Sequence, residues 1–148
     1  MNHCKLNKLL TKSVWYVPKE TLLAYETINN ITRPVQDQTI WVIDSYDHGY
    51  VLGTSYTFIN CVLAAKTRIV GSITPDGSVS FAFHSNNITY GYGKFGKISE
   101  RWQFLMQLND LSNLDGQVIG LSHWSYMRYL WDKCKVLPGC NLKFDSII

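Results

Sequence analysis

The stretch from Thr67 to Leu108 constrains the fold most strongly, because β-rich runs alternate there with compact turn signals almost without interruption. Its first turn, Pro75-Asp76-Gly77, combines a fixed φ, a side chain that bonds its own backbone, and a residue that tolerates positive φ. The flanking runs are rich in β-branched and aromatic residues, which favour strands. The pattern predicts an antiparallel meander.

Further strands are predicted on both sides of this meander. Thr39–Tyr46 and Tyr50–Ile59 are typical of a hairpin around Asp47-His48-Gly49, and Gln117–Tyr126 is predicted as the last strand. Repeated mid-strand glycines indicate strong curvature; they are Gly53, Gly71, Gly91 and Gly93. We therefore expect an all-β fold, an antiparallel meander that closes into a β-barrel of about seven to eight strands. The alternatives are a sandwich, which the short connections disfavour, and a strongly curved open sheet.

The remaining segments are predicted as short terminal helices, one further strand and loops. Asn2–Lys12 has apolar residues at helical spacing, and Val14–Val17 is predicted as a strand that Pro18 ends. Met127–Lys133 is expected to form a short helix near the C-terminus. Lys19–Ile31 is compatible with a helix or a strand, and we favour the helix. Two polar segments are predicted as loops, Thr32–Gln38 and Asn109–Gly116.

Length and composition indicate a single barrel-like domain over residues 1–148, with 46% hydrophobic and 14% aromatic residues to build its core. The net charge of +3 is too small to indicate a nucleic-acid or membrane-surface partner. No apolar run approaches the length of a membrane span. Met1–Leu10 lacks the sustained apolar core of a signal peptide, so we expect a cytoplasmic protein.

The four cysteines form no C-x-x-C pair, and no histidine lies at zinc-finger spacing from any of them. Only Cys134 and Cys140, which flank Pro138-Gly139, are close enough in sequence to suggest a disulfide. We favour four free thiols, at Cys4, Cys61, Cys134 and Cys140, in a reducing compartment.

Alternation along the strands separates an apolar face from a polar face. The apolar face is the predicted core and carries Val79, Phe81, Phe83, Trp102, Phe104, Met106 and Leu108. The polar side chains either face solvent, as is usual in antiparallel sheets, or enter a mixed interior and anchor a ligand. In the second case the ligand-binding residues are Arg101, Gln103, His84 and His123. That arrangement would require Trp102 and Phe104 to point away from the cavity.

Catalytic and cofactor-binding motifs are absent from the sequence, including the nucleophile elbow, the Walker loop and the H-E-x-x-H zinc motif. His84 and His123 could reach one end of the sheet and form a catalytic pair or ligate a metal or haem. Neither histidine has an evident acidic partner in the sequence. We therefore predict no cofactor and no metal site.

The run Leu10-Thr11-Lys12-Ser13-Val14-Trp15-Tyr16 resembles the opening of the calycin barrels, the lipocalin and avidin group. In that group a short helical turn leads into a first strand with a G-x-W-Y-like motif, and Ser13 stands here where the family has glycine. Lipocalins also place an arginine near the last strand, packed on the tryptophan, and Arg128 lies in that region. The resemblance implies an up-and-down barrel whose mouth or interior binds a small hydrophobic ligand.

Three classes of function fit these observations. Binding of a small hydrophobic or amphipathic ligand is favoured, since closed β-domains of this size commonly enclose a cavity. A protein–protein interaction module, with a protein partner or as a homo-oligomer, would present Trp and Tyr side chains together on one outer face. A cofactor-free barrel enzyme of the isomerase or decarboxylase type would hold a buried His or Arg with a strongly shifted titration.

Overall fold

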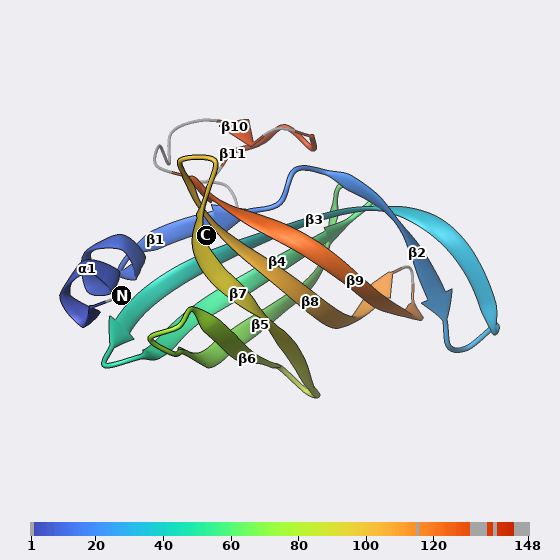
Figure 1. Cartoon of the computed structure of the whole chain (residues 1–148). Coiled ribbons are helices and arrows are strands. Elements are labelled where there is room, and N and C mark those ends of the chain that lie inside the picture. Colours follow the sequence, from blue (N-terminus) through green and yellow to red (C-terminus); the bar gives the residue numbers. More distant parts are fainter. Residues whose placement is uncertain (1, 115, 131–135, 138, 144–148) are drawn as a thin grey trace.

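Figure 1 shows the computed structural model of the chain, which describes residues 2–114, 116–130, 136, 137 and 139–143. Its elements are α1 (His3–Leu10), β1 (Ser13–Tyr16), β2 (Glu20–Glu26), β3 (Ile31–Asp47), β4 (Tyr50–Ile59), β5 (Val62–Ile73), β6 (Ser78–His84), β7 (Ile88–Ile98), β8 (Arg101–Leu114), β9 (Gln117–Leu130), β10 (Val136–Leu137) and β11 (Leu142–Lys143). Strands β3 to β9 pair with one another in chain order, each antiparallel to the next.

The sheet closes because the first strand of the barrel pairs on both sides. Both β1 and β2 pair with β3, and both also pair with β9. They therefore form one strand that is interrupted around Pro18, which cannot donate to a ladder. Counted in this way, the described residues form an eight-stranded up-and-down barrel (Figure 1), and the predicted all-β meander is confirmed.

Two predictions for the segment before Thr39 are wrong. Lys19–Ile31 is not a helix but contains β2, in which Ala24 and Glu26 are buried and alternate with exposed residues. Thr32–Gln38 is not a loop, because it belongs to the long strand β3. Pro34 is tolerated there because β3 pairs only with β2 at that level, and its ladder to β4 begins at Asp37.

The ends of the chain agree only partly with prediction. The helix predicted in Asn2–Lys12 is confirmed as α1, whose N-cap Asn2 accepts a hydrogen bond from the Lys5 amide through Oδ1 at 2.8 Å. The C-terminal helix is wrong in its described part, because Met127–Leu130 continue β9; residues 131–133 lie outside the described residues. The loop predicted over Asn109–Gly116 is wrong as far as Leu114, because these residues form the C-terminal half of β8. No helix in the described part of the chain has the length and apolar character needed to cross a membrane.

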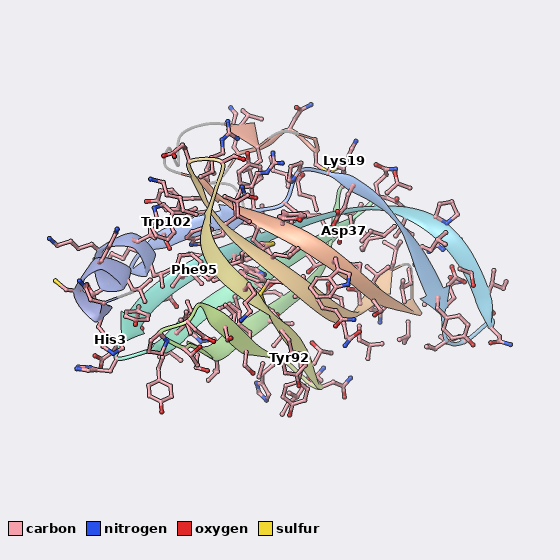
Figure 2. All side chains as sticks on the ribbon, in the orientation of Figure 1. His3, Lys19, Asp37, Tyr92, Phe95 and Trp102 are labelled. Atoms are coloured by element: carbon pink, nitrogen blue, oxygen red, sulfur yellow. A yellow bond between two sulfur atoms is a disulfide. The ribbon has the colours of Figure 1, made fainter. Side chains whose placement is uncertain are left out.

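The barrel interior is filled in three layers. At the end next to α1, buried rings pack at aromatic contact distances; we call Trp15, Trp41, Phe81, Phe83, Phe95 and Phe104 the aromatic plug. Figure 2 labels one of these rings, Phe95, and the partly buried Trp102 that stacks on it. At the opposite end, near the β2–β3 and β8–β9 turns, lies an aliphatic mouth layer of Ala24, Val35, Ile59, Leu114, Ile119 and Leu121. Polar side chains occupy the level between these two layers. The predicted apolar face is therefore confirmed as core, with Phe104 fully buried and Trp102 partly so.

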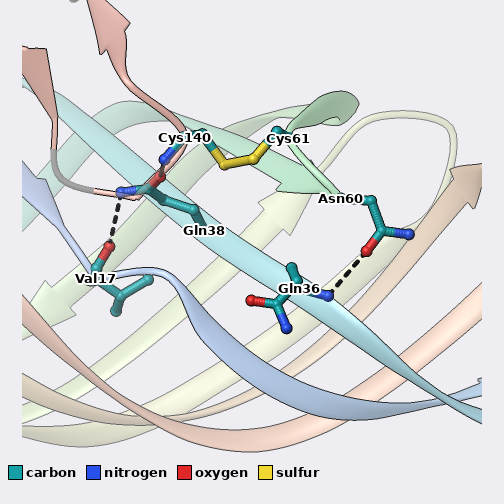
Figure 3. Close-up of a disulfide and its surroundings, with 6 residues drawn as sticks. All are labelled: Val17, Gln36, Gln38, Asn60, Cys61 and Cys140. Atoms are coloured by element: carbon teal, nitrogen blue, oxygen red, sulfur yellow. Dashed lines mark hydrogen bonds between the residues drawn. A yellow bond between two sulfur atoms is a disulfide. The ribbon is translucent and has the colours of Figure 1, made fainter.

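A C-terminal hairpin covers part of the outer surface of the barrel. β10 and β11 pair with each other, and Leu137 packs into a cluster with Val14, Ile40, Tyr56 and Phe58. A disulfide between Cys61 and Cys140 attaches this hairpin to the β4–β5 turn (Figure 3). The prediction of free thiols is therefore wrong for these two residues, whose Cα atoms lie 5.3 Å apart although the sequence separates them by 79 residues. Cys4 is free, and Cys134 lies outside the described residues.

Candidate functional site

Four ionisable side chains meet in the polar layer between the aromatic plug and the mouth layer. We call Glu20, Asp37, Asp110 and His123 the interior polar centre; they come from β2, β3, β8 and β9. Strand alternation directs them inward. Asp37 follows buried Val35 by two residues, and His123 follows buried Leu121 by the same interval.

One nitrogen of the His123 imidazole lies near two carboxylates. Its Nε2 atom is 3.9 Å from Asp37 Oδ2 and 4.0 Å from Asp110 Oδ2. Both separations are too long for a hydrogen bond. Glu20 is positioned by Ser125, whose hydroxyl donates a hydrogen bond of 2.8 Å to Glu20 Oε1.

Several polar atoms of the centre lack a hydrogen-bond partner among the described residues, although they are buried. These atoms are Oδ1 and Oδ2 of Asp37, Oδ2 of Asp110, and Nδ1 and Nε2 of His123. Glu26 is a useful contrast, because this buried carboxylate forms an ion pair with Arg33. Buried polar groups are normally satisfied, so a group of five unsatisfied atoms in one place points to a function or to a missing partner.

Burial shifts the pKa values of all four side chains of the interior polar centre. It raises the pKa of Asp37 to about 8, with smaller contributions from the negative charges of Asp110 and Glu20. Burial also raises the pKa of Asp110 to about 6 and lowers that of His123 to about 4. The pKa of Glu20 is raised by burial and lowered in part by the Ser125 hydrogen bond. At neutral pH, Asp37 therefore holds a proton and His123 is uncharged, whereas Asp110 is largely ionised.

The barrel wall is incompletely paired around the centre. β9 pairs with β1 at Val14–Tyr16 and with β2 only at Tyr25 and Glu26, so the ladder is interrupted at the level of Glu20. A small groove of about 190 Å³ lies there and reaches Glu20. It is lined by Val17, Pro18, Lys19, Glu20, Trp124, Tyr126 and Arg128.

A larger surface groove reaches the centre at Asp110. The ladder between β7 and β8 ends at the pair Gly91 and Leu108, just before Asp110. The groove has a volume of about 550 Å³, and we call it the Asp110 groove. It is lined by Leu23, Tyr25, Thr89, Asn109, Asp110, Leu111, Gly120, Leu121 and Ser122. Asp110 belongs both to this lining and to the interior polar centre.

The structure does not bring the four predicted ligand-binding residues together. His123 alone lies in the interior. Arg101 and His84 are exposed at opposite ends of the barrel, next to the β7–β8 and β6–β7 turns. Gln103 shares the outward face of β8 with Arg101, and its Nε2 donates to the Ile98 carbonyl at 3.3 Å. The ligand-binding role assigned to these residues stays a prediction, but they do not form one patch.

The three acidic members of the centre were missed because each lies in a segment that was assigned to the wrong kind of structure. Asp37 and Asp110 lie in predicted loops, and Glu20 lies in the predicted helix. The alternation Val35-x-Asp37-x-Thr39-x-Trp41 is the signal that could have revealed the first of them, because it continues the inward face of the confirmed strand.

Exposed aromatic side chains gather on the outer face of β7, β8 and β9. Tyr92 on β7 and Trp124 on β9 both pair with Gln107 on β8, so the two rings flank one residue. Tyr90 and Tyr126 lie beside them on the same outward face, and about half of each of the four side chains is exposed. This is the placement expected of an interaction module.

No protein-family model matches the chain, and no curated protein or solved structure is significantly similar to it.

Proposed function

We propose that the protein binds a small amphipathic molecule in the Asp110 groove, with a basic group of the molecule on the Asp110 carboxylate. The observation that carries the proposal is the meeting of this groove with the ionisable interior at Asp110. A volume of about 550 Å³ is within the usual range for small-molecule sites. Such sites combine an apolar lining with a few polar groups that fix the orientation of the ligand.

The lining indicates which part of the ligand goes where. Leu23, Tyr25 and Leu111 offer exposed apolar surface for a hydrocarbon body. Asp110 is ionised above about pH 6 because that is its raised pKa, so at neutral pH it favours an ammonium or another donor. A carboxylate-bearing ligand would place two negative charges together in a poorly solvated site and is disfavoured.

The barrel itself also supports a binding function. An eight-stranded up-and-down barrel is the architecture that the resemblance to the calycin group implies. The detail of that resemblance differs at Arg128, which pairs with Tyr16 and so lies on the opposite face from Trp15. The ring of Trp15 contacts Phe95, Phe104 and Tyr129. Because the aromatic plug fills one half of the interior, we place the ligand in the Asp110 groove.

The test compares two probes with the same chain and opposite head-group charge, dodecylamine and dodecanoate, by calorimetry in the presence of EDTA. Dodecylamine should bind, and Asp110→Asn should weaken it roughly 10- to 100-fold, the cost of a lost charge-assisted hydrogen bond. Gly120→Leu should also weaken binding, because Gly120 lines the groove and has room for a side chain. The exposed Asp47→Asn variant is the matched control and should bind normally. Equal binding of both probes, or no effect of Asp110→Asn, would refute the proposal.

A second candidate is a cofactor-free acid–base enzyme that uses the same groove. It is favoured by one observation, the raised pKa of about 6 at Asp110, which suits a general base at neutral pH. Native mass spectrometry of the purified protein would identify a co-purifying ligand. Conversion of that ligand by the protein, with loss of turnover but not of binding in Asp110→Glu, would favour the enzyme.

A further inference from the structure

We infer that Glu20, Asp37 and His123 bind one divalent transition-metal ion inside the barrel. Each residue offers one ligand atom, and the three atoms lie within 4.8 Å of one another. This inference goes beyond the proposed function, since an ion at these residues is bound whether or not an amine occupies the Asp110 groove. The sequence predicted no metal site because His123 lacked an evident acidic partner, and the fold supplies two.

The separations fit ligands around an ion better than they fit direct contacts. Metal–oxygen and metal–nitrogen bonds of about 2.1 Å place tetrahedral ligands roughly 3.4 Å apart. Asp37 Oδ2 and His123 Nε2 are 3.9 Å apart, about 0.5 Å more than this spacing, and all three ligand atoms lie within 4.8 Å of one another. A hydrogen-bonded pair would have been closer.

The buried ligand atoms have no other partner among the described residues. Asp37 is fully buried with both carboxylate oxygens unsatisfied, and the His123 side chain is 5% exposed with both nitrogens unsatisfied. Among the residues that the structure describes, no Lys or Arg forms an ion pair with Asp37 or Asp110. A divalent cation would supply both the missing positive charge and the missing bonds.

A bridging water is the simplest competing explanation. It could satisfy two or three of these five atoms, but it would bring no positive charge to balance the ionised Asp110 carboxylate beside them. The ligand set also indicates the kind of ion, because one imidazole and two carboxylates suit Zn²⁺, Mn²⁺, Fe²⁺ or Co²⁺. Ca²⁺ is disfavoured, because it prefers six to eight oxygen ligands.

The surroundings provide a route and an additional oxygen. Glu20 lines the groove of about 190 Å³ at the interruption between β1 and β2, where an ion could enter. Asp110 Oδ2 lies 4.0 Å from the same His123 nitrogen, so a further carboxylate is available beside the three ligands. Ser125 holds Glu20 by its hydrogen bond, which positions the ligand carboxylate.

The test is a Co²⁺ titration of the EDTA-treated and desalted full chain, followed by the visible d–d absorption of the ion. We expect saturation at one equivalent, release by EDTA, competition by Zn²⁺ and a higher melting temperature of the loaded protein. Asp37→Asn and His123→Gln should each weaken binding roughly tenfold or more. Glu20→Gln should also weaken Co²⁺ binding. It is the safer variant for folding, because Glu20 is only partly buried and its replacement is better tolerated.

A surface site is the most important control. His3 and His48 have ring centroids 5.6 Å apart beside Asp47, so they could hold Co²⁺ adventitiously. The double variant His3→Gln/His48→Gln should retain one equivalent of Co²⁺ and an unchanged spectrum. Loss of binding in this variant, or no binding at one equivalent in the wild type, would overturn the inference. Because the dodecylamine test is run in EDTA, failure of the metal inference leaves the proposed amine site intact, and failure of the amine test leaves the metal inference intact.

Discussion

Asp37 and His123 approach to 3.9 Å, measured from Oδ2 to Nε2, although β3 and β9 are not neighbours in the sheet. The interrupted first strand lies between them in the barrel wall. The two side chains therefore meet inside the barrel, not along a shared ladder. Closure of the sheet creates this contact and also removes both groups from water, which determines how they titrate.

The stability of the metal-free protein should decrease as pH rises, because of Asp37. Its folded pKa of about 8 is higher than its ordinary value of 3.8, so between these values the native state binds the proton more tightly than the unfolded state. The stabilising contribution is complete below about pH 4 and is lost as pH rises through 8. We expect Asp37→Asn, which cannot ionise, to gain roughly 2–5 kcal/mol relative to wild type between pH 5 and pH 9.

Urea unfolding in EDTA at the two pH values measures this difference. Asp110 contributes in the same direction at lower pH, whereas His123, with its pKa lowered to about 4, destabilises the fold as pH falls below 6.5. The exposed Asp47→Asn variant is the control and should follow wild type at both pH values. If the free energy of unfolding changes with pH equally in Asp37→Asn and wild type, the pKa of Asp37 is not raised in the folded protein.

Trp15→Ala should destabilise the protein by about 3–5 kcal/mol, the usual cost of emptying a large aromatic site. Trp15 is fully buried in the aromatic plug, with the Phe104 ring centroid at 4.6 Å. Its Nε1 donates a hydrogen bond of 2.8 Å to the Ser13 hydroxyl, and that bond is also lost. Trp124→Ala is the matched control, because Trp124 is 58% exposed. A melting temperature that falls by less than a couple of degrees for Trp15→Ala would contradict the plug.

Cys61→Ser should lower the free energy of unfolding by about 2–5 kcal/mol, because the disulfide to Cys140 closes a long loop. It should also loosen the hairpin of β10 and β11 and uncover Tyr56 and Phe58, which increases binding of an apolar dye. Dithiothreitol should lower the melting temperature of wild type but not that of Cys61→Ser. Cys4→Ser is the control and should behave as wild type, since Cys4 is exposed and free.

The cytoplasmic localisation expected from the sequence stays a prediction, and the redox state of Cys61 in cells offers one test of it. Alkylation of intact cells before lysis would report a free thiol if the compartment is reducing. If Cys61 and Cys140 are fully disulfide-bonded in cells, the protein is in an oxidising compartment and the cytoplasmic prediction is contradicted.

The fold could be predicted because one face of each central strand is strongly apolar. Val79, Phe81 and Phe83 alternate with the small residues Ser80 and Ala82, and this period of two is typical of a half-buried strand. The β2 segment gave no such signal, because Leu22 and Leu23 are adjacent and suit either period. Pro34 indicated a loop, and only the structure shows that β3 pairs with β2 at this proline and is unpaired there on the side of β4.

The site could not be predicted from the sequence for a different reason. Asp37 and Asp110 lie in segments that Pro34 and a run of polar residues predicted to be loops, and buried carboxylates are rare. Their burial results from closure of the barrel, which no local pattern encodes. His123 was predicted as a candidate because it lies in a clear strand, but the side chains around it come from three other strands. The face occupied by Arg101 and His84 is the solvent face, in agreement with the simpler of the two interpretations.

Gly93→Ala should destabilise the barrel by roughly 1–3 kcal/mol, the usual cost of overpacking a fixed position. An added Cβ at Gly93 would lie 1.9 Å from the Leu105 carbonyl oxygen and 2.8 Å from the Met106 sulfur, so β7 and β8 would have to separate. Gly96→Ala on the same strand is the matched control, because its Cβ would meet no atom within 4 Å. Alanine at Gly96 should be neutral or slightly stabilising, since it restricts the unfolded chain. Urea unfolding measures the stability of both variants. Equal losses would show that the close approach of β7 to β8 is not the reason why position 93 requires a glycine.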